Sequence, residues 1–243
     1  MTPGEKTAGG KPYLFIQNGD APVIVWCTSR ICREDAASLL REAAVRCGAP
    51  VFSLFMFAEE DWNAAFTPWR AETKRGVFGG RAEDTLAWLT EYAVPAIREK
   101  TAAPLILAGY SLAGLFALWC MSRTALFSAY VSCSGSLWFP GWEAYARQAR
   151  ARGECIVYLS LGDAEEKTKD PQMAAVRRMT VLQELLLARD PKVLNAVLRT
   201  EHGGHFNDPV GRLARGIAWT LLHAGEPPER VRPFSGPRQG RDK

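Results

Sequence analysis

The sequence predicts an α/β protein with a mostly parallel central sheet and helices on both faces. Short apolar runs rich in β-branched residues alternate with longer helical patterns along most of the chain. Gly, Pro, Asn and Asp punctuate the boundaries between them. The length of 243 residues suits one large domain or two small ones. Strands that alternate with helices favour right-handed βαβ units, and therefore a parallel sheet.

The apolar runs are short enough to be strands. Strands are expected at 13–17, 22–28, 51–58, 104–110, 129–135, 155–162 and 193–200. A turn signal, Asn18-Gly19-Asp20, separates the first two runs, so these are expected to pair as a hairpin. Such a hairpin would give the sheet an antiparallel edge.

Helical patterns fill the intervals between the strands. Helices are expected at 34–47, 83–100, 141–153, 171–189 and 210–225, and directly after Ser111. Gly48 is expected to end the first helix, and Pro95 to kink the second. Asp208-Pro209 is a start signal for the last helix.

Three segments do not follow this alternation of strands and helices. Residues 1–12 and 226–243 are expected to be flexible ends of a single domain that spans 13–225. Residues 59–82 read as a long loop rich in aromatic side chains. Long ordered loops in compact domains are usually functional. Because this one follows a strand, we expect it near the carboxyl edge of the sheet, where open α/β folds place their sites.

Composition and charge exclude several partners. The formal net charge is +4, and the segment 226–243 supplies +2 of it, since it holds five basic and three acidic residues. The body has no basic stripe, so no nucleic-acid partner is expected. No apolar stretch approaches the ~20 residues of a membrane span. The opening "MTPGEKTAGGKP" lacks the apolar core of a signal peptide, which favours a cytoplasmic location.

The cysteines indicate buried free thiols. The chain has six, none in a C-x-x-C pair. Cys27, Cys133 and Cys155 lie in strand-like runs. Free thiols in a reducing compartment fit this pattern better than disulfides or a metal site. No metal ion and no organic cofactor is expected.

One serine stands where a strand turns sharply into a helix, in "LILAGYSLAGLFALW" at 105–119. This is the context of a nucleophile elbow, in which a strained turn exposes the serine above the sheet and small neighbours let helix and strand pack closely. The usual pattern is G-x-S-x-G, but Ala113 holds the second glycine position and Gly114 follows it. The alternative is that Ser111 simply caps the helix, and a motif this short does not decide between the two.

A serine nucleophile needs a general base, usually histidine. The chain has three histidines. His223 falls near the end of the last helix, where the helix dipole favours it. His202 and His205 lie in "EHGGHFNDP", just after the last strand. His205 is the preferred base, since the flexibility of Gly203-Gly204 would let its ring swing over Ser111, and His202 is expected to be an ordinary loop residue.

The third member of a triad is an acid that orients the histidine. It is expected between serine and histidine in the chain, after an intervening strand. "LSLGDAEEKTKDP" offers Asp163, Glu165, Glu166 and Asp170 directly after the strand 155–162. The order serine, acid, histidine at successive strand ends is much more specific than the serine motif alone, and it favours a hydrolase site. Asp163 and Glu165 both remain candidates for the acid.

Over roughly residues 20–225 the chain resembles the α/β-hydrolase family of putative esterases that contains esterase D and the enterochelin esterases. The resemblance rests on these segments: "GYSLAGLFAL", "FSAYVSCSGSLWF", "DWNAAFTPW", "LGDAE" and "GGHF". It implies an α/β-hydrolase fold for the domain at 13–225. It also implies that Ser111 is the nucleophile, that His205 is the base and that Trp138 lies beside the site. The acid turn of the family places its acid three residues after a glycine, which implies Glu165. Besides Ala113, the chain departs from the family where "CTSRICRED" replaces an H-G or D-G oxyanion segment.

These observations together predict a serine esterase that cleaves small-molecule carboxylic esters through an acyl-enzyme. The backbone N–H of Leu112 is the expected oxyanion donor, and Thr28 or Ser29 is a candidate for the second. Aromatic residues are expected to line the substrate pocket, namely Trp62, Trp69 and Trp138. A non-catalytic scaffold, or an acyltransferase or peptidase with the same triad, would fit the same residues, because a fold does not fix function. The sequence indicates neither the substrate nor the oligomeric state.

Overall fold

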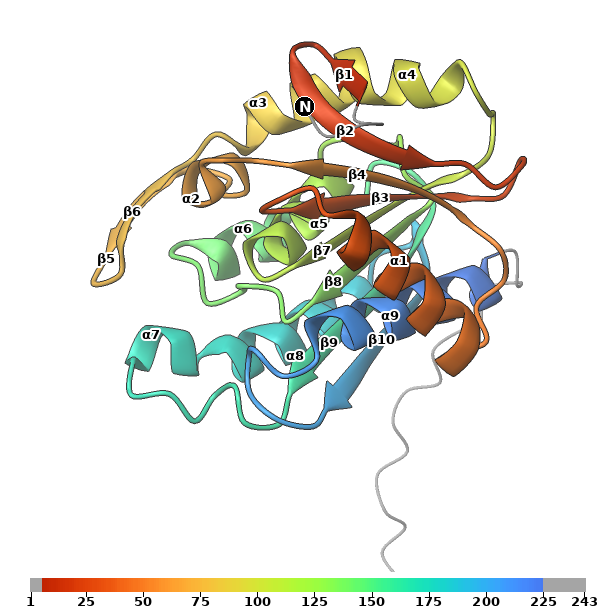
Figure 1. The fold of residues 1–243 in the computed structure, drawn as a ribbon. Coiled ribbons are helices and arrows are strands. Elements are labelled where there is room, and N and C mark those ends of the chain that lie inside the picture. The colour runs from red at the N-terminus through yellow and green to blue at the C-terminus, as the bar shows by residue number, and fades with distance from the viewer. Residues whose placement is uncertain (1–5, 225–243) are drawn as a thin grey trace, which may run out of the picture.

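The centre of the molecule is an eight-stranded sheet (Figure 1). The computed structural model describes residues 6–224. Its sheet strands are β1 (Lys6–Ala8), β2 (Lys11–Ile16), β3 (Val23–Thr28), β4 (Ser53–Ala58), β7 (Leu105–Tyr110), β8 (Ala129–Cys133), β9 (Cys155–Gly162) and β10 (Val193–Glu201). Their spatial order is β1-β2-β4-β3-β7-β8-β9-β10. Neighbours run parallel from β4 to β10, so the predicted mostly parallel sheet is confirmed.

The predicted pairing of 13–17 with 22–28 is wrong. β2 pairs antiparallel with β4, and β3 lies between β4 and β7. The residues of β3 from Val23 to Cys27 are buried, as a continuous apolar run in the middle of a parallel sheet should be. The turn residue Asn18 joins β2 to the start of β4, since its side chain donates to the Phe52 carbonyl (2.7 Å) and its N–H donates to Ser53 Oγ (2.9 Å).

An antiparallel edge does exist, but β1 and β2 form it. Lys6 lies opposite Tyr13, and Ala8 lies opposite Lys11. Residues 6–12, assigned from the sequence to a flexible N-terminal segment, therefore belong to paired strands or to the turn that joins them. The sequence gives little sign of β1 because it is only three residues long and its residues are mostly exposed. The predicted flexible tail at 226–243 lies outside the described residues.

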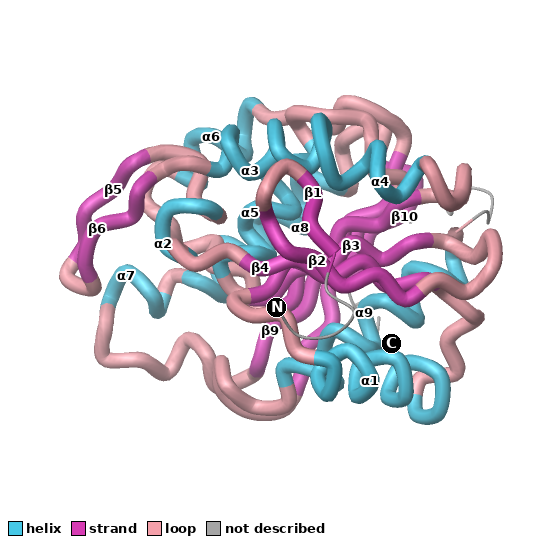
Figure 2. Tube along the Cα trace, turned by 45° about the horizontal axis from the view of Figure 1, so that its top comes forward, coloured by secondary structure: helices cyan, strands magenta, loops and turns pink. Residues whose placement is uncertain are grey.

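Helices cover both faces of the sheet (Figures 1 and 2). They are α1 (Arg33–Arg41), η1 (Glu42–Arg46), α2 (Trp62–Ala65), α3 (Ala82–Trp88), η2 (Leu89–Ala93), α4 (Val94–Arg98), α5 (Leu112–Met121), α6 (Trp142–Gln148), α7 (Pro171–Ala174), α8 (Val176–Leu187) and α9 (Pro209–His223), where η marks a π-helical turn. α1 and α9 pack on one face, and α3 to α6 and α8 pack on the other. The π-helical turn η2 directly precedes the α4 turn that holds Pro95. Asp208 begins α9 by accepting from the Gly211 N–H (3.1 Å).

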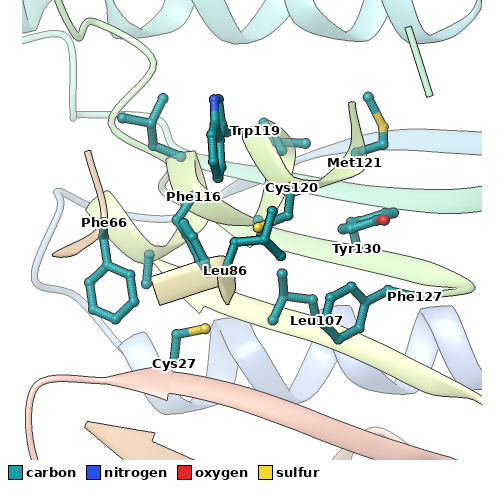
Figure 3. Close-up of a cluster of buried hydrophobic side chains, with 14 of the residues drawn as sticks. Cys27, Phe66, Leu86, Leu107, Phe116, Trp119, Cys120, Met121, Phe127 and Tyr130 are labelled. Carbon is teal, nitrogen blue, oxygen red and sulfur yellow. The ribbon is translucent and has the colours of Figure 1, made fainter. Parts of the chain in front are cut away.

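The larger of the two apolar cores surrounds α5 (Figure 3). Every residue of α5 is buried, which is typical of a helix that is apolar all round. Phe116 of α5 packs against Phe66, with ring centroids 5.4 Å apart. Because α5 begins immediately after Ser111, this packing fixes the position of that serine.

The segment 59–82 is not the unstructured loop that its composition suggests. It contains the short helix α2, whose first turn Asp61 caps, and a hairpin of β5 (Arg70–Thr73) and β6 (Gly76–Gly79). The buried Thr67 ties the segment together, because its hydroxyl accepts from the Gly80 N–H (3.0 Å) and donates to the Asn63 carbonyl (2.7 Å). The hairpin projects at the carboxyl end of the parallel strands, on the left of Figure 1.

All six cysteines are free thiols, and four of them are buried. Burial raises the pKa of Cys133 and of Cys155 to about 12, so both stay protonated near neutral pH. Within residues 6–224, no cluster of three or more His, Cys, Asp or Glu side chains could hold a metal ion. None of the helices in this range has the length and apolarity to cross a membrane.

Candidate active site

Ser111 stands at the sharp turn between β7 and α5. Its φ of 58° and ψ of −122° fall in a region that non-glycine residues rarely adopt, so the predicted strained corner is confirmed. A Cβ on Gly109 would collide with the backbone of Ala113, which shows how closely the strand and the helix approach. The Ser111 side chain makes no capping bond to α5. Its hydroxyl therefore points elsewhere, and the alternative of a simple helix cap fails.

Three side chains from separate strand ends meet at this corner. Ser111 Oγ lies 3.1 Å from His205 Nε2, and His205 Nδ1 lies 2.8 Å from Glu165 Oε2. Ser111 follows β7, Glu165 follows β9 and His205 follows β10. Parallel strands end at one edge of the sheet, so loops distant in sequence converge there. The His205 side chain is 23% exposed and that of Glu165 only 3%.

Glu165 is held by donors on both carboxylate oxygens. Besides His205 on Oε2, the Gly162 N–H (2.7 Å), the Ser134 hydroxyl (2.7 Å) and Arg212 (2.8 Å) all donate to Oε1. Burial acts to raise the pKa of Glu165, but the hydrogen bonds from His205, Gly162 and Ser134 outweigh it and hold that pKa below its usual value. The carboxylate is therefore ionised near neutral pH.

The structure does not bring Asp163 and His202 to Ser111. Asp163 Oδ1 accepts from the Gly203 N–H (2.8 Å), and chiefly this bond lowers the Asp163 pKa. Its other oxygen lies 3.4 Å from His202 Nδ1, and the His202 side chain is 99% exposed. His223 lies at the far end of α9, with Nδ1 2.7 Å from the Trp219 carbonyl.

The two glycines before His205 form a tight turn and not the swinging hinge that the sequence suggested. Gly203 has a φ of 95°, and a Cβ there would lie 2.7 Å from Asn207 Cγ. Asn207 Oδ1 accepts from the Gly204 N–H (2.8 Å) and closes the turn. At position 203 glycine is needed, because a side chain would have no room and would strain the backbone.

Four polar side chains at the site were missed by the sequence reasoning. Tyr110 donates to the His205 carbonyl (2.7 Å), and burial raises the pKa of Tyr110 to about 12, so the phenol stays protonated. Ser136 Oγ lies 3.2 Å from Ser111 Oγ, and the Ser136 N–H donates to the Ser111 carbonyl (3.0 Å). Ser134 and Arg212 contact Glu165, as described above. The "SGS" segment was the available signal for both serines, whereas Arg212 had none that separated it from the other basic residues of α9.

Positions for the oxyanion donors follow from the backbone. Leu112 is the first residue of α5, so its N–H has no acceptor within the helix. Thr28 ends β3, the strand beside β7, and Ser29 follows it at the same edge of the sheet. This arrangement leaves Leu112, Thr28 and Ser29 as the candidates that the sequence named.

The three candidate tryptophans have different surroundings, although all are half-buried. Trp138 lines an open cavity of about 600 Å³ between α6 and the α7–α8 segment. One of its lining residues, Leu137, directly follows Ser136 in the chain. Trp69 donates to the Pro140 carbonyl (2.8 Å) and packs on Phe139, and Trp62 packs edge-on against Phe66, with ring centroids 4.8 Å apart. Neither Trp62 nor Trp69 is among the residues that line this cavity.

Comparison with known proteins shows the fold. No family model matches the sequence, and no curated protein matches it. An IroE-like serine hydrolase from Shewanella oneidensis has a similar structure, with a TM-score of 0.72, 16% identity and coverage of 86% of this chain and 75% of that one. The siderophore hydrolase EstB from Aspergillus nidulans matches with a TM-score of 0.68, 19% identity and coverage of 93% and 98%. EstA from the same organism, also a siderophore hydrolase, matches with a TM-score of 0.68, 16% identity and coverage of 87% and 90%. The chain therefore has the predicted α/β-hydrolase fold.

Proposed function

We propose that this chain is a serine hydrolase that cleaves carboxylic esters through an acyl-enzyme on Ser111. The observation that carries the proposal is the unbroken chain of hydrogen bonds from Ser111 Oγ through both ring nitrogens of His205 to the buried carboxylate of Glu165. Serine, base and orienting acid in this geometry are the working parts of acyl transfer. Structural neighbours described as serine and siderophore hydrolases support it as well.

Each residue has a definite part in the proposed reaction. His205 Nε2 takes the Ser111 proton as the hydroxyl attacks the ester carbonyl, and then returns it to the leaving alcohol. Glu165 accepts from Nδ1–H, which selects the tautomer with a free Nε2 and stabilises the imidazolium. The Leu112 N–H stabilises the tetrahedral oxyanion, and one such donor typically contributes about 3–4 kcal/mol. Water then hydrolyses the acyl-enzyme by the same proton transfers.

The surroundings indicate where the rest of the substrate lies. The cavity beside Trp138 is open and large enough for a sizeable substituent, and its lining includes Leu137, the residue after Ser136. Next to the base, Phe206 is 89% exposed and its ring meets the His205 ring edge-on, with centroids 5.0 Å apart. The apolar surfaces of this cavity and of Phe206 favour small-molecule esters with bulky parts. Because EstA and EstB are siderophore hydrolases, siderophore esters are a first substrate class to try.

The test combines covalent labelling with turnover. A fluorophosphonate probe and a panel of acyl esters of varied chain length, with a siderophore lactone included, are applied to the wild type and to Ser111→Ala. We expect labelling and hydrolysis by the wild type, and neither by the variant. An unlabelled and inactive wild type contradicts the proposal and favours a non-catalytic scaffold. Product analysis with an added alcohol acceptor separates a hydrolase from an acyltransferase.

A further inference from the structure

Arg212 is a fully buried charge between the acid and the histidine segment. Its side chain is 0% exposed. One terminal nitrogen, Nη1, donates to Glu165 Oε1 (2.8 Å) and to Ser134 Oγ (2.8 Å). The other, Nη2, donates to the backbone carbonyls of His202 (3.1 Å) and Gly204 (3.0 Å). A single guanidinium thus bridges the loop after β9 and the loop after β10.

The neighbouring chain is shaped around this guanidinium. A Cβ on Gly162 would lie 2.8 Å from Arg212 Nη2 and 3.0 Å from Glu165 Oε1, and would collide with the Gly203 carbonyl. Glycine at the end of β9 therefore leaves the room that the guanidinium and the carboxylate occupy. Burying a charge is unfavourable unless it is paired and hydrogen-bonded, and an apolar residue would pack on α9 at lower cost. A buried guanidinium at this position therefore indicates a role beyond packing.

We propose that Arg212 is a positioning residue that sets Glu165 and His205 in register. Because Nη1 holds Oε1, the second oxygen of Glu165 is directed at His205 Nδ1. Because Nη2 holds the carbonyls on both sides of Gly203, the turn that carries His205 is fixed against the same guanidinium. Arg212 makes no contact with Ser111. It acts through the groups that it holds, namely Glu165, Ser134, the Tyr110 hydroxyl (3.2 Å) and the carbonyls of the histidine turn. This inference rests on the proposed function.

The planar fork of arginine is essential to this role. Its donors point in fixed directions and reach two acceptor groups at once, whereas a lysine ammonium is a single point charge on a flexible stem. Arg212→Lys therefore keeps a buried cation but can serve only one of the two loops well. Arg212→Met keeps the unbranched apolar stem but removes the guanidinium and every donor.

Arg215 supplies the matched control on the same helix. It is 40% exposed and pairs with Glu201 and Asp208, but it contacts neither Glu165 nor the carbonyls of the histidine turn. Arg215→Met therefore removes an arginine and its ion pairs from α9 without changing the contacts that orient the triad.

The experiment measures kcat, KM and the second-order rate of fluorophosphonate labelling, with circular dichroism and thermal melting to confirm folding. For Arg212→Lys and Arg212→Met we expect kcat and the labelling rate to fall by about 10- to 100-fold, as is common when a residue that orients an active group is lost. KM should stay within about twofold, because the residue does not touch substrate. Arg215→Met should melt at a lower temperature but keep the wild-type kcat.

Two results would overturn the inference. Folded Arg212 variants with the wild-type kcat and labelling rate would show that the guanidinium only stabilises the fold. If neither variant folds, Arg212→Gln decides. Its single amide group cannot hold both the Glu165 carboxylate and the carbonyls of the histidine turn, so kcat must fall at unchanged KM, and an unchanged kcat overturns the role. A wild type that is neither labelled nor active contradicts the proposed function itself, which is a different outcome.

Discussion

Replacing Glu165 by glutamine changes one atom of the site and should nearly abolish turnover. The carboxylate now receives three donors on Oε1, from Gly162, Ser134 and Arg212, and one on Oε2, from His205. The amide oxygen of glutamine will take the side with three donors, because the opposite orientation would point an NH₂ group at all three. The NH₂ group then faces His205 Nδ1.

An NH₂ group at Nδ1 forces the wrong tautomer on His205. Nδ1 must accept, so Nε2 carries the proton and cannot take another from Ser111. The same exchange of carboxylate for amide lowers kcat by about 10⁴ in a serine protease triad, or about 5 kcal/mol of barrier. The loss of stability should be smaller than that, because the amide oxygen keeps accepting from Arg212 and its neighbours.

Asp163→Asn is the paired variant. Its side chain is half exposed, and Asn Oδ1 can still accept from the Gly203 N–H. We expect nearly unchanged kcat and a lower melting temperature, since the carboxylate that anchors this turn is gone. The assay compares kcat on one activated ester with the melting temperature for both variants. Loss of turnover in Asp163→Asn, with an active Glu165→Gln, would refute the tautomer argument and make Asp163 the acid.

The remaining predictions use the same assays. Ser111→Ala should fold normally and lose about 10⁴-fold or more of its activity, and retained labelling by the probe would contradict that. His205→Ala should be nearly as inactive, while His202→Ala should keep most of its turnover because that side chain is 99% exposed. An equal loss of turnover in both variants would contradict the assignment of His205 as the base. Ala144→Trp should fill the cavity beside Trp138 and reduce hydrolysis of bulky esters while sparing acetyl esters, and a uniform effect on both would argue against substrate binding there. The pKa of Glu165 lies below the usual carboxyl value of 4.5, so the ionised carboxylate stabilises the fold above that pH. This contribution disappears as the pH falls through the lower folded-state pKa. On acidification from neutral pH, the free energy of unfolding measured by chemical denaturation should therefore fall less in Glu165→Gln than in the wild type.

Local patterns were sufficient for most of the fold. Apolar runs of strand length and the Asp208-Pro209 start signal report on short stretches of chain, and the structure has strands and helices at nearly all the expected places. Strand order is a different kind of information. The turn at Asn18 looks like a hairpin turn, but its side chain bonds to Phe52, and no local rule distinguishes these two uses.

The expected triad residues could be predicted from the sequence for a geometric reason. In a parallel sheet the loops after neighbouring strands share one edge, and β7, β8, β9 and β10 are neighbours both in the chain and in space. A serine, an acid and a histidine placed after three of these strands must therefore lie near one another, whatever the details of the turns. Whether Glu165 or Asp163 faces the histidine depends on how the loop after Gly162 turns, and the spacing of strands does not determine that.

Arg212 could not be predicted in this way, because it reaches the site from α9, which lies on the opposite face of the sheet to α5. On α9, Arg212 and Arg215 are three residues apart in "VGRLARG", and the helical period alone places both near the same face. Arg212 differs from Arg215 in its surroundings, namely the space left by Gly162 at the end of β9 and the two carbonyls of the histidine turn. These surroundings belong to other parts of the chain. A buried charge is identified by the partners that compensate it, and those partners are distant in sequence. The residues that perform chemistry at a strand end are therefore easier to predict than the residues that orient them.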